Sequence, residues 1–261
     1  MSHRAHDYRH LVERWRAVAR SAGVPLRRLE RADGFDHFYL TTPALGKTGG
    51  IYFSAGIHGD EPASTEALIV WAERLGKKLG NLPLLLFPCL NPWGLVQNMR
   101  ANLQGADLNR GFHRTDLPVL EAMKRVAAGH QFEAAVMLHE DYDGQGVYLY
   151  EIQRVQPYWG EALLAAARAH LPTDPRTWID GRKAVKGIHR RRLDRRRFAR
   201  IGYPEAIWLH LEHSVRTFTV ETPSECALEQ RVAAHVAVIE EIVRRVMASS
   251  RRPSSGRAGR E

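Results

Sequence analysis

Apolar residues recur along the chain with two different periods, which alternate from one segment to the next. Segments with apolar side chains three or four residues apart, bounded by glycine or proline, predict helices over residues 8–22, 62–75, 119–128, 159–171 and 227–247. Continuously apolar or alternating segments predict strands over residues 38–42, 51–55, 82–90, 134–138, 147–152, 207–211 and 216–221. Continuous apolar strands that alternate with helices are typical of a sheet covered on both faces. The pattern therefore predicts an α/β fold with three layers, α/β/α, around a mixed sheet.

Length and composition favour a single domain. The 261 residues, 44% of them hydrophobic, are enough for one domain with a sizeable core. The chain shows no internal repeat and no convincing linker, so we predict one domain over residues 1–248. Residues 249–261 are basic and poor in apolar side chains, which predicts a disordered tail.

The net charge of +9 is local rather than spread over the chain. Residues 182–200 hold ten Lys or Arg and one Asp, and the tail from Ser249 adds four Arg and one Glu. Basic runs can contact phosphates. No recognised nucleic-acid motif accompanies these runs, so we interpret them as a solvated helix face and a tail, and we do not expect nucleic-acid binding.

Cysteine usage and hydropathy bear on the compartment. Cys89 and Cys226 are far apart and form no C-x-x-C pair, so a disulfide framework is not expected. The first thirty residues lack the continuous apolar core of a signal peptide. The longest apolar runs, such as residues 82–90, are too short to cross a bilayer. We therefore expect a cytoplasmic protein that does not bind membranes.

Three residues at predicted strand ends have the chemistry of zinc ligands. His58 and Glu61 follow the strand over residues 51–55, and His139 follows the strand over residues 134–138. Each could be an ordinary polar residue, but two imidazoles and one carboxylate suit zinc, and a catalytic zinc keeps three protein ligands and one position for water. Because ligands gather at the C-terminal strand ends of such sheets, we predict one zinc ion per chain at this point.

A carboxylate closes a third predicted strand. Phe218 and Val220 can face the core, which leaves Thr219 and Glu221 on the other side by strand alternation. A carboxylate beside a zinc-bound water can take its proton and pass it to the leaving nitrogen. Glu221 is therefore the candidate general base and acid; the alternative is a surface glutamate at a strand end.

Four polar residues between the predicted strands over residues 82–90 and 134–138 are candidates for substrate binding and its support. Arg110, next to Asn109, can clamp a carboxylate with two parallel hydrogen bonds. Arg100 could donate to the oxyanion that develops during attack. Asp107 could accept the second ring N–H of a zinc-bound histidine and so fix its tautomer. The alternative is a polar loop with local salt bridges.

These residues, in this order and at about this spacing, resemble the zinc carboxypeptidase (M14-type) superfamily, with its succinylglutamate desuccinylase and aspartoacylase branch. The matching sequence segments are His58-Gly59-Asp60-Glu61, Asn91-Pro92-Trp93-Gly94, residues 100–112, Leu138-His139 and residues 218–223. The resemblance implies a mixed, mostly parallel sheet of eight strands. It also implies zinc held by His58, Glu61 and His139, with Glu221 as general base, Arg100 at the oxyanion, Asn109 and Arg110 on the substrate carboxylate, and Asp107 in support.

Two features depart from the larger carboxypeptidases of this superfamily. The chain is shorter, so loops that shape the substrate site are reduced or missing. Those enzymes also carry a mobile tyrosine before the catalytic glutamate. Tyr203, eighteen residues before Glu221, is the nearest candidate, and an ordinary loop tyrosine beside Pro204 is the alternative.

Three functions are compatible with the sequence. The first is a metallocarboxypeptidase that acts on small peptides, and the second is an N-acyl-amino-acid amidohydrolase of the desuccinylase type. Both cleave an amide next to a free carboxylate. In the amidohydrolase, the basic residues 182–200 could favour an acidic acyl group or side chain. The third is a basic binding module with a decayed site, which the complete set of reacting residues argues against. Oligomeric state is not indicated.

Overall fold

The central element is an eight-stranded sheet in the order β1-β2-β4-β3-β5-β10-β6-β9. The computed structural model describes residues 4–190, 193 and 202–249. Four of the seven strand pairings are parallel and three are antiparallel, so the sheet is mixed and mostly parallel, as predicted. The strands are β1 (Leu26–Ala32), β2 (Phe35–Thr41), β3 (Thr48–Ser54), β4 (Leu84–Phe87), β5 (Gln131–Asp141), β6 (Tyr148–Gln153), β9 (Ile188–Arg190) and β10 (Ser214–Pro223).

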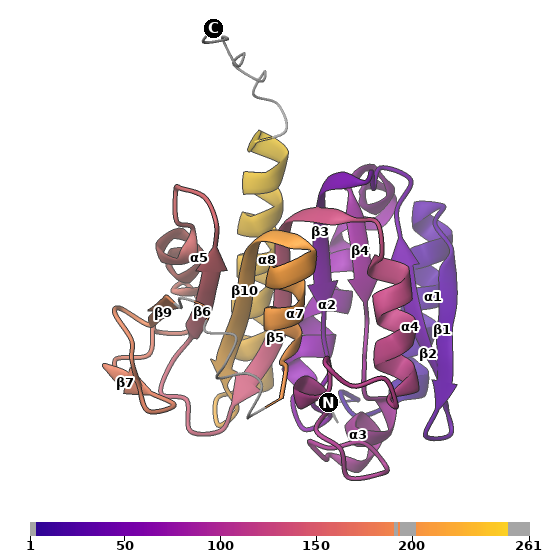
Figure 1. Ribbon diagram of the computed structural model, residues 1–261, viewed down its shortest axis with the longest axis horizontal. Coiled ribbons are helices and arrows are strands. Elements are labelled where there is room, and N and C mark those ends of the chain that lie inside the picture. The colour runs from indigo at the N-terminus through magenta and orange to yellow at the C-terminus, as the bar shows by residue number, and fades with distance from the viewer. Residues whose placement is uncertain (1–3, 191–192, 194–201, 250–261) are drawn as a thin grey trace, which may run out of the picture.

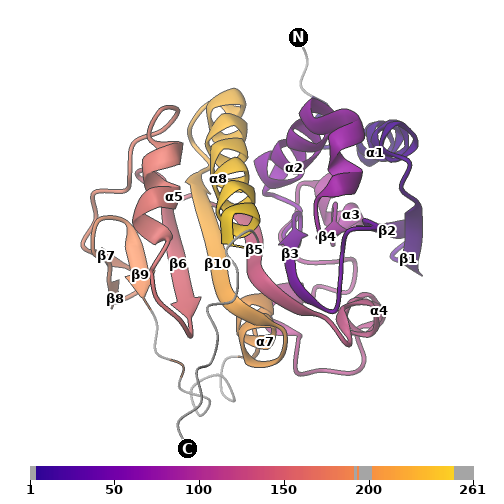
Figure 2. The same ribbon diagram turned by 90° about the horizontal axis from the view of Figure 1, so that it is seen from above.

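Helices cover both faces of this sheet and complete the three layers (Figures 1 and 2). One face carries α1 (Tyr8–Ala22), α2 (Pro62–Leu75), α5 (Gly160–Ala167) and α8 (Leu228–Ser249). The other face carries α4 (Pro118–Ala127) and α7 (Glu205–Glu212). Each face of the sheet has its own apolar core, which includes Phe53 and Phe218 on the first face and Tyr52 and Phe132 on the second. The side chains of β3 alternate between these two cores, which is the reason that Ile51, Tyr52 and Phe53 are apolar in succession.

The smaller elements lie at the ends of this framework. They are the helix α3 (Pro92–Gln97), the short 3-10 helices Gly76–Asn81 and Leu108–Arg110, and a separate hairpin of β7 (Trp178–Ile179) and β8 (Arg182–Lys183). Among the described residues, no helix combines the length and the apolar character needed to cross a membrane. The single domain over residues 1–248 stays a prediction. Of the tail predicted over residues 249–261, Ser249 is the last residue of α8 and the rest lies outside the described residues. Most of the basic run after residue 190 also lies outside them.

Strand register brings the predicted chemistry to one edge of the sheet. β3, β4, β5 and β10 run parallel, so their C-terminal ends meet at this edge. In β10, Glu221 pairs with His139 of β5 on one side and with Tyr148 of β6 on the other. Because β6 runs antiparallel to β10, it contributes its N-terminal end here. Three strands therefore deliver side chains to one place.

The strand predicted over residues 207–211 is wrong, because this segment lies within helix α7. Pro204 is the N-cap residue and Glu205 occupies the first turn, which is a helix start that the apolar run concealed. Ile207 and Leu211, one turn apart, pack in one cluster, while Trp208 and Leu209 pack against the sheet in another. A short apolar run has no period of its own that separates a strand from a buried helix. The sequence alone also gave no indication of β1 as a strand.

Helix α7 carries a histidine that makes the stability depend on pH. His210 is only 6% exposed, and its burial, with the nearby charge of Arg154, lowers the pKa of its ring to about 4. An unfolded histidine has a pKa of about 6.5, so between pH 6.5 and pH 4 the unfolded chain binds more protons and stability falls as the pH falls. From pH 7 to pH 5 we expect a loss of about 1–2 kcal/mol from this residue. Urea denaturation at both pH values measures it.

The loss assigned to His210 has a direct control. His210→Gln should lower the pH 7 to pH 5 difference by about 1–2 kcal/mol relative to the wild type. His170→Gln, a change at an exposed histidine, should keep the wild-type difference. Equal pH dependence in the wild type and His210→Gln would contradict the assignment.

Candidate metal and catalytic site

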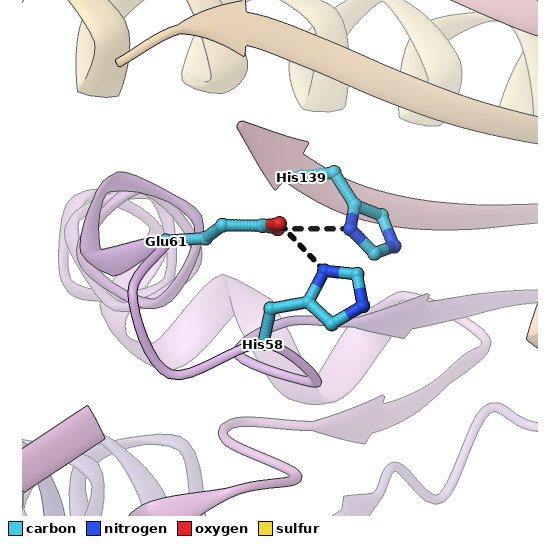
Figure 3. Close-up of side chains that lie close together, drawn as sticks. All are labelled: His58, Glu61 and His139. Atoms are coloured by element: carbon cyan, nitrogen blue, oxygen red, sulfur yellow. Dashed lines mark hydrogen bonds and ion pairs between the residues drawn. The ribbon is translucent and has the colours of Figure 1, made fainter. Parts of the chain in front are cut away.

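His58, Glu61 and His139 converge on one buried point, although 78 residues separate Glu61 from His139 in the sequence. His58 Nδ1 lies 2.5 Å from Glu61 Oε1, and His139 Nδ1 lies 2.8 Å from Glu61 Oε2. Both rings present the same nitrogen to the carboxylate (Figure 3). One donor atom from each residue lies within 4.8 Å of the others, and all three side chains are buried. The structure thus assembles the three side chains that the sequence selected as metal ligands.

The two carboxylates and the histidine rings of this buried cluster shift the pKa values of one another. Burial disfavours the charged His58 ring, but the carboxylates of Glu61 and Asp107 outweigh it and raise the pKa of His58 to about 9. Burial likewise opposes the charge on Glu61, yet His58 and His139 hold the pKa of Glu61 well below its usual range. Two nitrogens and a carboxylate around one point are also the donor set of a divalent cation such as zinc. The residues present therefore fit a metal ion.

The loop after β3 is shaped to present His58 and Glu61. Gly56, with φ of +61°, turns the chain away from the sheet, and its N–H donates to Ser64 Oγ at 3.1 Å. Ser64 Oγ donates to the Glu61 carbonyl at 2.7 Å. Glu61 is the N-cap residue of α2, and Pro62 occupies the first helical position, where a missing N–H costs nothing. The position of the ligands is thus fixed by the start of a helix packed in the core.

Gly59, between the two ligands, passes against the backbone of α3. A Cβ atom built on Gly59 would lie 1.9 Å from the carbonyl carbon of Gly94 and 2.2 Å from the nitrogen of Leu95. The Gly59 N–H also donates to the Met99 carbonyl at 3.1 Å. The sequence pairs His58-Gly59 and Trp93-Gly94 thus meet in space, with no room for a side chain.

Gly59→Ala should displace the ligand loop, because the clash is with backbone atoms that cannot rotate away. We expect a loss of about 2–4 kcal/mol of stability and a fall in metal affinity of 10-fold or more. Calorimetric zinc titration and urea denaturation measure the two effects. Gly46→Ala is the control: a Cβ atom built on Gly46 meets only one atom, at 3.7 Å, so this substitution should change neither quantity. Gly105→Ala is not suitable as a control, because Gly105 has a φ of +75°. Wild-type zinc affinity in Gly59→Ala would show that the loop tolerates the shift.

Glu221 lines the same cavity, which has a volume of about 250 Å³. Thr219 lines it as well, so the predicted alternation of β10 is observed. Burial raises the pKa of Glu221 to about 8, and the charges of Glu61, Asp141 and Asp180 add to the effect while His139 opposes it. A carboxyl group with a pKa near neutrality can both accept and return a proton at working pH.

Arg100 and Asp107 form a bridge beside the ligands. Asp107 Oδ1 lies 3.3 Å from His58 Nε2, the ring nitrogen that faces away from Glu61. Arg100 donates from Nε and Nη2 to Asp107 Oδ2 at 3.2 Å, and its Nη1 lies 3.6 Å from Glu61 Oε1. Asp107 thus makes the contact required to fix the His58 tautomer. Arg100 lines the cavity and is half exposed, so it can also reach a substrate oxygen.

Asn109 and Arg110 line the same cavity. The Asn109 N–H donates to Asp107 Oδ1, and its Oδ1 accepts from the Glu205 N–H, both at 2.9 Å. Asn109 therefore joins the bridge to the start of α7. Arg110 Nη1 donates to the Asn109 carbonyl at 2.9 Å, which leaves other guanidinium N–H groups for a ligand.

Tyr203 does not line this cavity. Its ring meets His113 edge-on, with the centroids 5.9 Å apart, and its backbone accepts from the Phe112 N–H. The tyrosines that line the cavity are Tyr148 and Tyr150 of β6. Their alternation in the sequence was visible, but nothing in the sequence indicated that their face of β6 is the one beside Glu221.

A buried ion pair between Glu140 and Arg231, beside the candidate ligand Glu61, was not predicted from the sequence. Glu140 is 5% exposed; its Oε2 accepts from the Ala63 N–H at 2.8 Å, and its Oε1 accepts from Arg231 of α8. The Glu140 N–H donates to Glu61 Oε2 at 3.1 Å, so the residue also holds the ligand carboxylate. Burial raises the pKa of Glu140 to about 7 despite Arg231. The only sequence signal was the unusual carboxylate directly after His139.

Comparison with known families and proteins agrees with this site. Residues 47–144, which include all three candidate ligands, match the family described as the succinylglutamate desuccinylase/aspartoacylase catalytic domain. Murein peptide amidase A of Escherichia coli K12 is 30% identical over 125 residues, 46% of this chain and 50% of the relative. The chain thus matches about half the length of this relative. The resemblance predicted from the motifs is confirmed by these findings.

Solved structures show the same fold at low sequence identity. A candidate metallopeptidase from Shewanella denitrificans OS217 is 21% identical with a TM-score of 0.81, covering 93% of this chain and 91% of that one. A metallo-carboxypeptidase from Burkholderia cenocepacia is 18% identical with a TM-score of 0.65, covering 93% and 69%. The murein-tripeptide amidase of E. coli O157 is 17% identical with a TM-score of 0.58, covering 84% and 91%. The eight-stranded architecture is therefore confirmed.

Proposed function

We propose that this chain, whose fold and motifs are those of the M14-type zinc carboxypeptidase superfamily, is a zinc-dependent carboxypeptidase that acts on small peptides. One observation carries the proposal: a single cavity is lined by His58, Glu61 and His139, by Glu221, and by Arg110. These supply a metal site, a proton carrier and a carboxylate clamp. Its similarity to a metallo-carboxypeptidase and to a murein peptide amidase supports small peptides as substrates, including peptides from the bacterial cell wall.

The residues of the chain have distinct roles in this proposal. His58, Glu61 and His139 hold zinc, which when bound acidifies a water molecule and polarises the scissile carbonyl. Glu221 accepts a proton at its carboxylate and delivers it to the leaving nitrogen. Arg100 donates hydrogen bonds to the oxygen that gains charge.

The clamp fixes which bond is cut. Asn109 and Arg110 bind the terminal carboxylate, and Arg110 is the residue that can do so with two parallel hydrogen bonds. Because Asn109 is tied to Asp107 and Glu205, the clamp has a fixed place relative to the ligands. Asp107 keeps the His58 ring oriented through Nε2.

An N-acyl-amino-acid amidohydrolase of the desuccinylase type is the second candidate. The match of residues 47–144 to the succinylglutamate desuccinylase/aspartoacylase domain favours it. The reacting groups serve both reactions, because both substrates carry an amide beside a free carboxylate. The two differ only in what occupies the acyl side of the bond.

The test is a mixed substrate pool with products read by mass. The zinc-loaded protein is incubated with free-acid peptides, the same peptides as C-terminal amides, and N-acyl amino acids. Loss of one residue from the free acids alone supports the carboxypeptidase. Release of acyl groups with peptides untouched supports the amidohydrolase, and equal cleavage of acids and amides contradicts the clamp.

A matched pair of variants tests the clamp. Arg110→Lys keeps the charge but loses the paired hydrogen bonds, so KM for free-acid peptides should rise by roughly 10-fold or more. Arg114→Lys, at an exposed arginine paired with Asp116, should leave KM unchanged.

A further inference from the structure

A second cavity, with a volume of about 600 Å³, adjoins the loop that carries Asn109 and Arg110. None of the residues that line the catalytic cavity lines this one. Leu108 lines the second cavity, whereas its neighbour Asn109 lines the first. The other walls come from residues 102–106, from the turn between β1 and β2, and from the start of α4; the last two lie at one end of the molecule (Figure 1). The second cavity is therefore a separate site on the same loop.

A buried histidine in the wall of the second cavity has no hydrogen-bond partner. His37 of β2 is 2% exposed, and neither ring nitrogen is in hydrogen-bond geometry with a described residue, although the backbone of Ala32 and Leu90 acts on the ring. Burial lowers the pKa of His37, so the ring is neutral at pH 7, with one donor and one acceptor nitrogen. A half-turn of the ring exchanges nitrogen and carbon positions and so brings a nitrogen to a different part of the wall. Because buried polar groups normally have partners, His37 calls for a ligand that both donates and accepts.

The first turn of α4 makes the second cavity favourable for a negative group. Leu117, Pro118 and Val119 line the cavity. Leu117 is the N-cap residue, and its side chain makes no hydrogen bond to the N–H groups of this turn. The acidic residue of the turn, Glu121, is paired with Lys124 at 2.6 Å. The N-terminal end of a helix carries a partial positive charge and binds carboxylates and phosphates through its N–H groups.

Charged side chains of both signs line the second cavity. Arg114 and Asp116 are bound to each other by two hydrogen bonds. Arg31 makes one ion pair, which leaves other guanidinium N–H groups for a ligand. Asp33 accepts from the neutral amide of Gln104 at 2.7 Å, and no ion pair of Asp33 is recorded among the described residues. Apolar side chains complete the wall: Ala32, Ala106, Leu108, Leu117 and Val119.

We propose that the second cavity binds a free α-amino acid with an apolar side chain, such as leucine. The carboxylate accepts from the start of α4 and from Arg31, the ammonium donates to Asp33, and the side chain contacts the apolar wall. His37 meets the same two charged groups, since it has one donor and one acceptor. The proposed carboxypeptidase would release such an amino acid, but the site does not depend on that reaction. Because Leu108 precedes Asn109, an amino acid bound here contacts the loop of the proposed clamp.

Calorimetric titration of the zinc-loaded protein tests both charges of the ligand. The probes are leucine, 4-methylpentanoate, which lacks the ammonium, and 3-methylbutylamine, which lacks the carboxylate. Leucine should bind at least roughly 10-fold more tightly than either analogue, the usual effect of losing one charge-assisted hydrogen bond. Absence of leucine binding, or equal binding of either analogue, overturns the proposal.

Two variants assign the binding to this cavity. Asp33→Asn removes the charge and suits the backbone, because asparagine tolerates the φ of +54° at this position and keeps an acceptor for Gln104. It should weaken leucine binding by roughly 10-fold or more. His37→Phe keeps a planar ring without its nitrogens and should also weaken binding, with urea denaturation to show that it is folded. Asp143→Asn, at an exposed position, is the control and should bind leucine as the wild type does.

A third variant separates the second cavity from the catalytic one. Arg110→Ser removes the proposed clamp, so leucine bound in the second cavity should remain, with an affinity within about twofold. Loss of all leucine binding in Arg110→Ser, with wild-type binding in Asp33→Asn, would place leucine at the clamp and overturn the proposal. A protein that cleaves no peptide but binds leucine through Asp33 would keep the second site and reject the carboxypeptidase.

Discussion

Replacing Glu221 by glutamine should lower kcat by about 10²- to 10⁴-fold, the usual contribution of a positioned general acid–base group. Glutamine has nearly the same shape but cannot take a proton from water or return it to the leaving nitrogen. KM should change little, because Glu221 acts on the reacting atoms rather than on the substrate carboxylate. Steady-state kinetics on whichever free-acid peptide the pool identifies measure the effect.

The loss in Glu221→Gln should be separable from damage to the metal site or the fold. Burial raises the pKa of Glu221, so a neutral amide suits its surroundings, and stability and zinc content should be maintained. Glu225→Gln makes the same change at an exposed position four residues later and should retain full activity. Substantial hydrolysis by a zinc-loaded Glu221→Gln protein would contradict the role of Glu221 as general base and acid.

Arg231→Met should destabilise the protein by about 3–5 kcal/mol, because it leaves the buried carboxylate of Glu140 without its cation. The long apolar stem of methionine fills much of the same space, so the loss reports the unpaired charge rather than a cavity. Urea denaturation at pH 8 measures it.

Two further variants give the Arg231 prediction its controls. Adding Glu140→Gln removes the stranded charge and should restore a large part of the stability. Arg244→Met breaks an exposed pair with Glu241 on the same helix and should cost at most about 1 kcal/mol. Equal effects of Arg231→Met and Arg244→Met would show that the buried pair contributes nothing special.

The sequence predicted that the candidate reacting groups would lie together, because residues of suitable chemistry stand at the ends of predicted strands. His58, His139 and Glu221 each follow or close an apolar strand, and parallel strands place such residues at one edge. Asp107 was identified from residue type, and its contact with His58 is present. The roles of these residues stay predictions until the variants are measured.

The walls of the cavity were much less predictable than its reacting groups. Asp180 is positioned by a two-residue turn, and Arg231 reaches Glu140 from 91 residues away, so neither has a local signal. Tyr148 and Tyr150 could not be assigned to the cavity from the sequence, because their place depends on the pairing of β6 with β10. Helix α7 was mistaken for a strand because a short apolar run satisfies both periods.

The direction of β6 has a consequence for how such a site can diversify. Its antiparallel course places its first residues beside Glu221 while the chain that follows it leads through α5 to the β7–β8 hairpin. The side chains of β6 and of the turn between β7 and β8 that line the cavity therefore belong to a stretch of chain separate from the loop that carries His58 and Glu61. Insertions or substitutions between residues 172 and 187 could change which substrates are accepted while the bond-breaking apparatus is inherited intact.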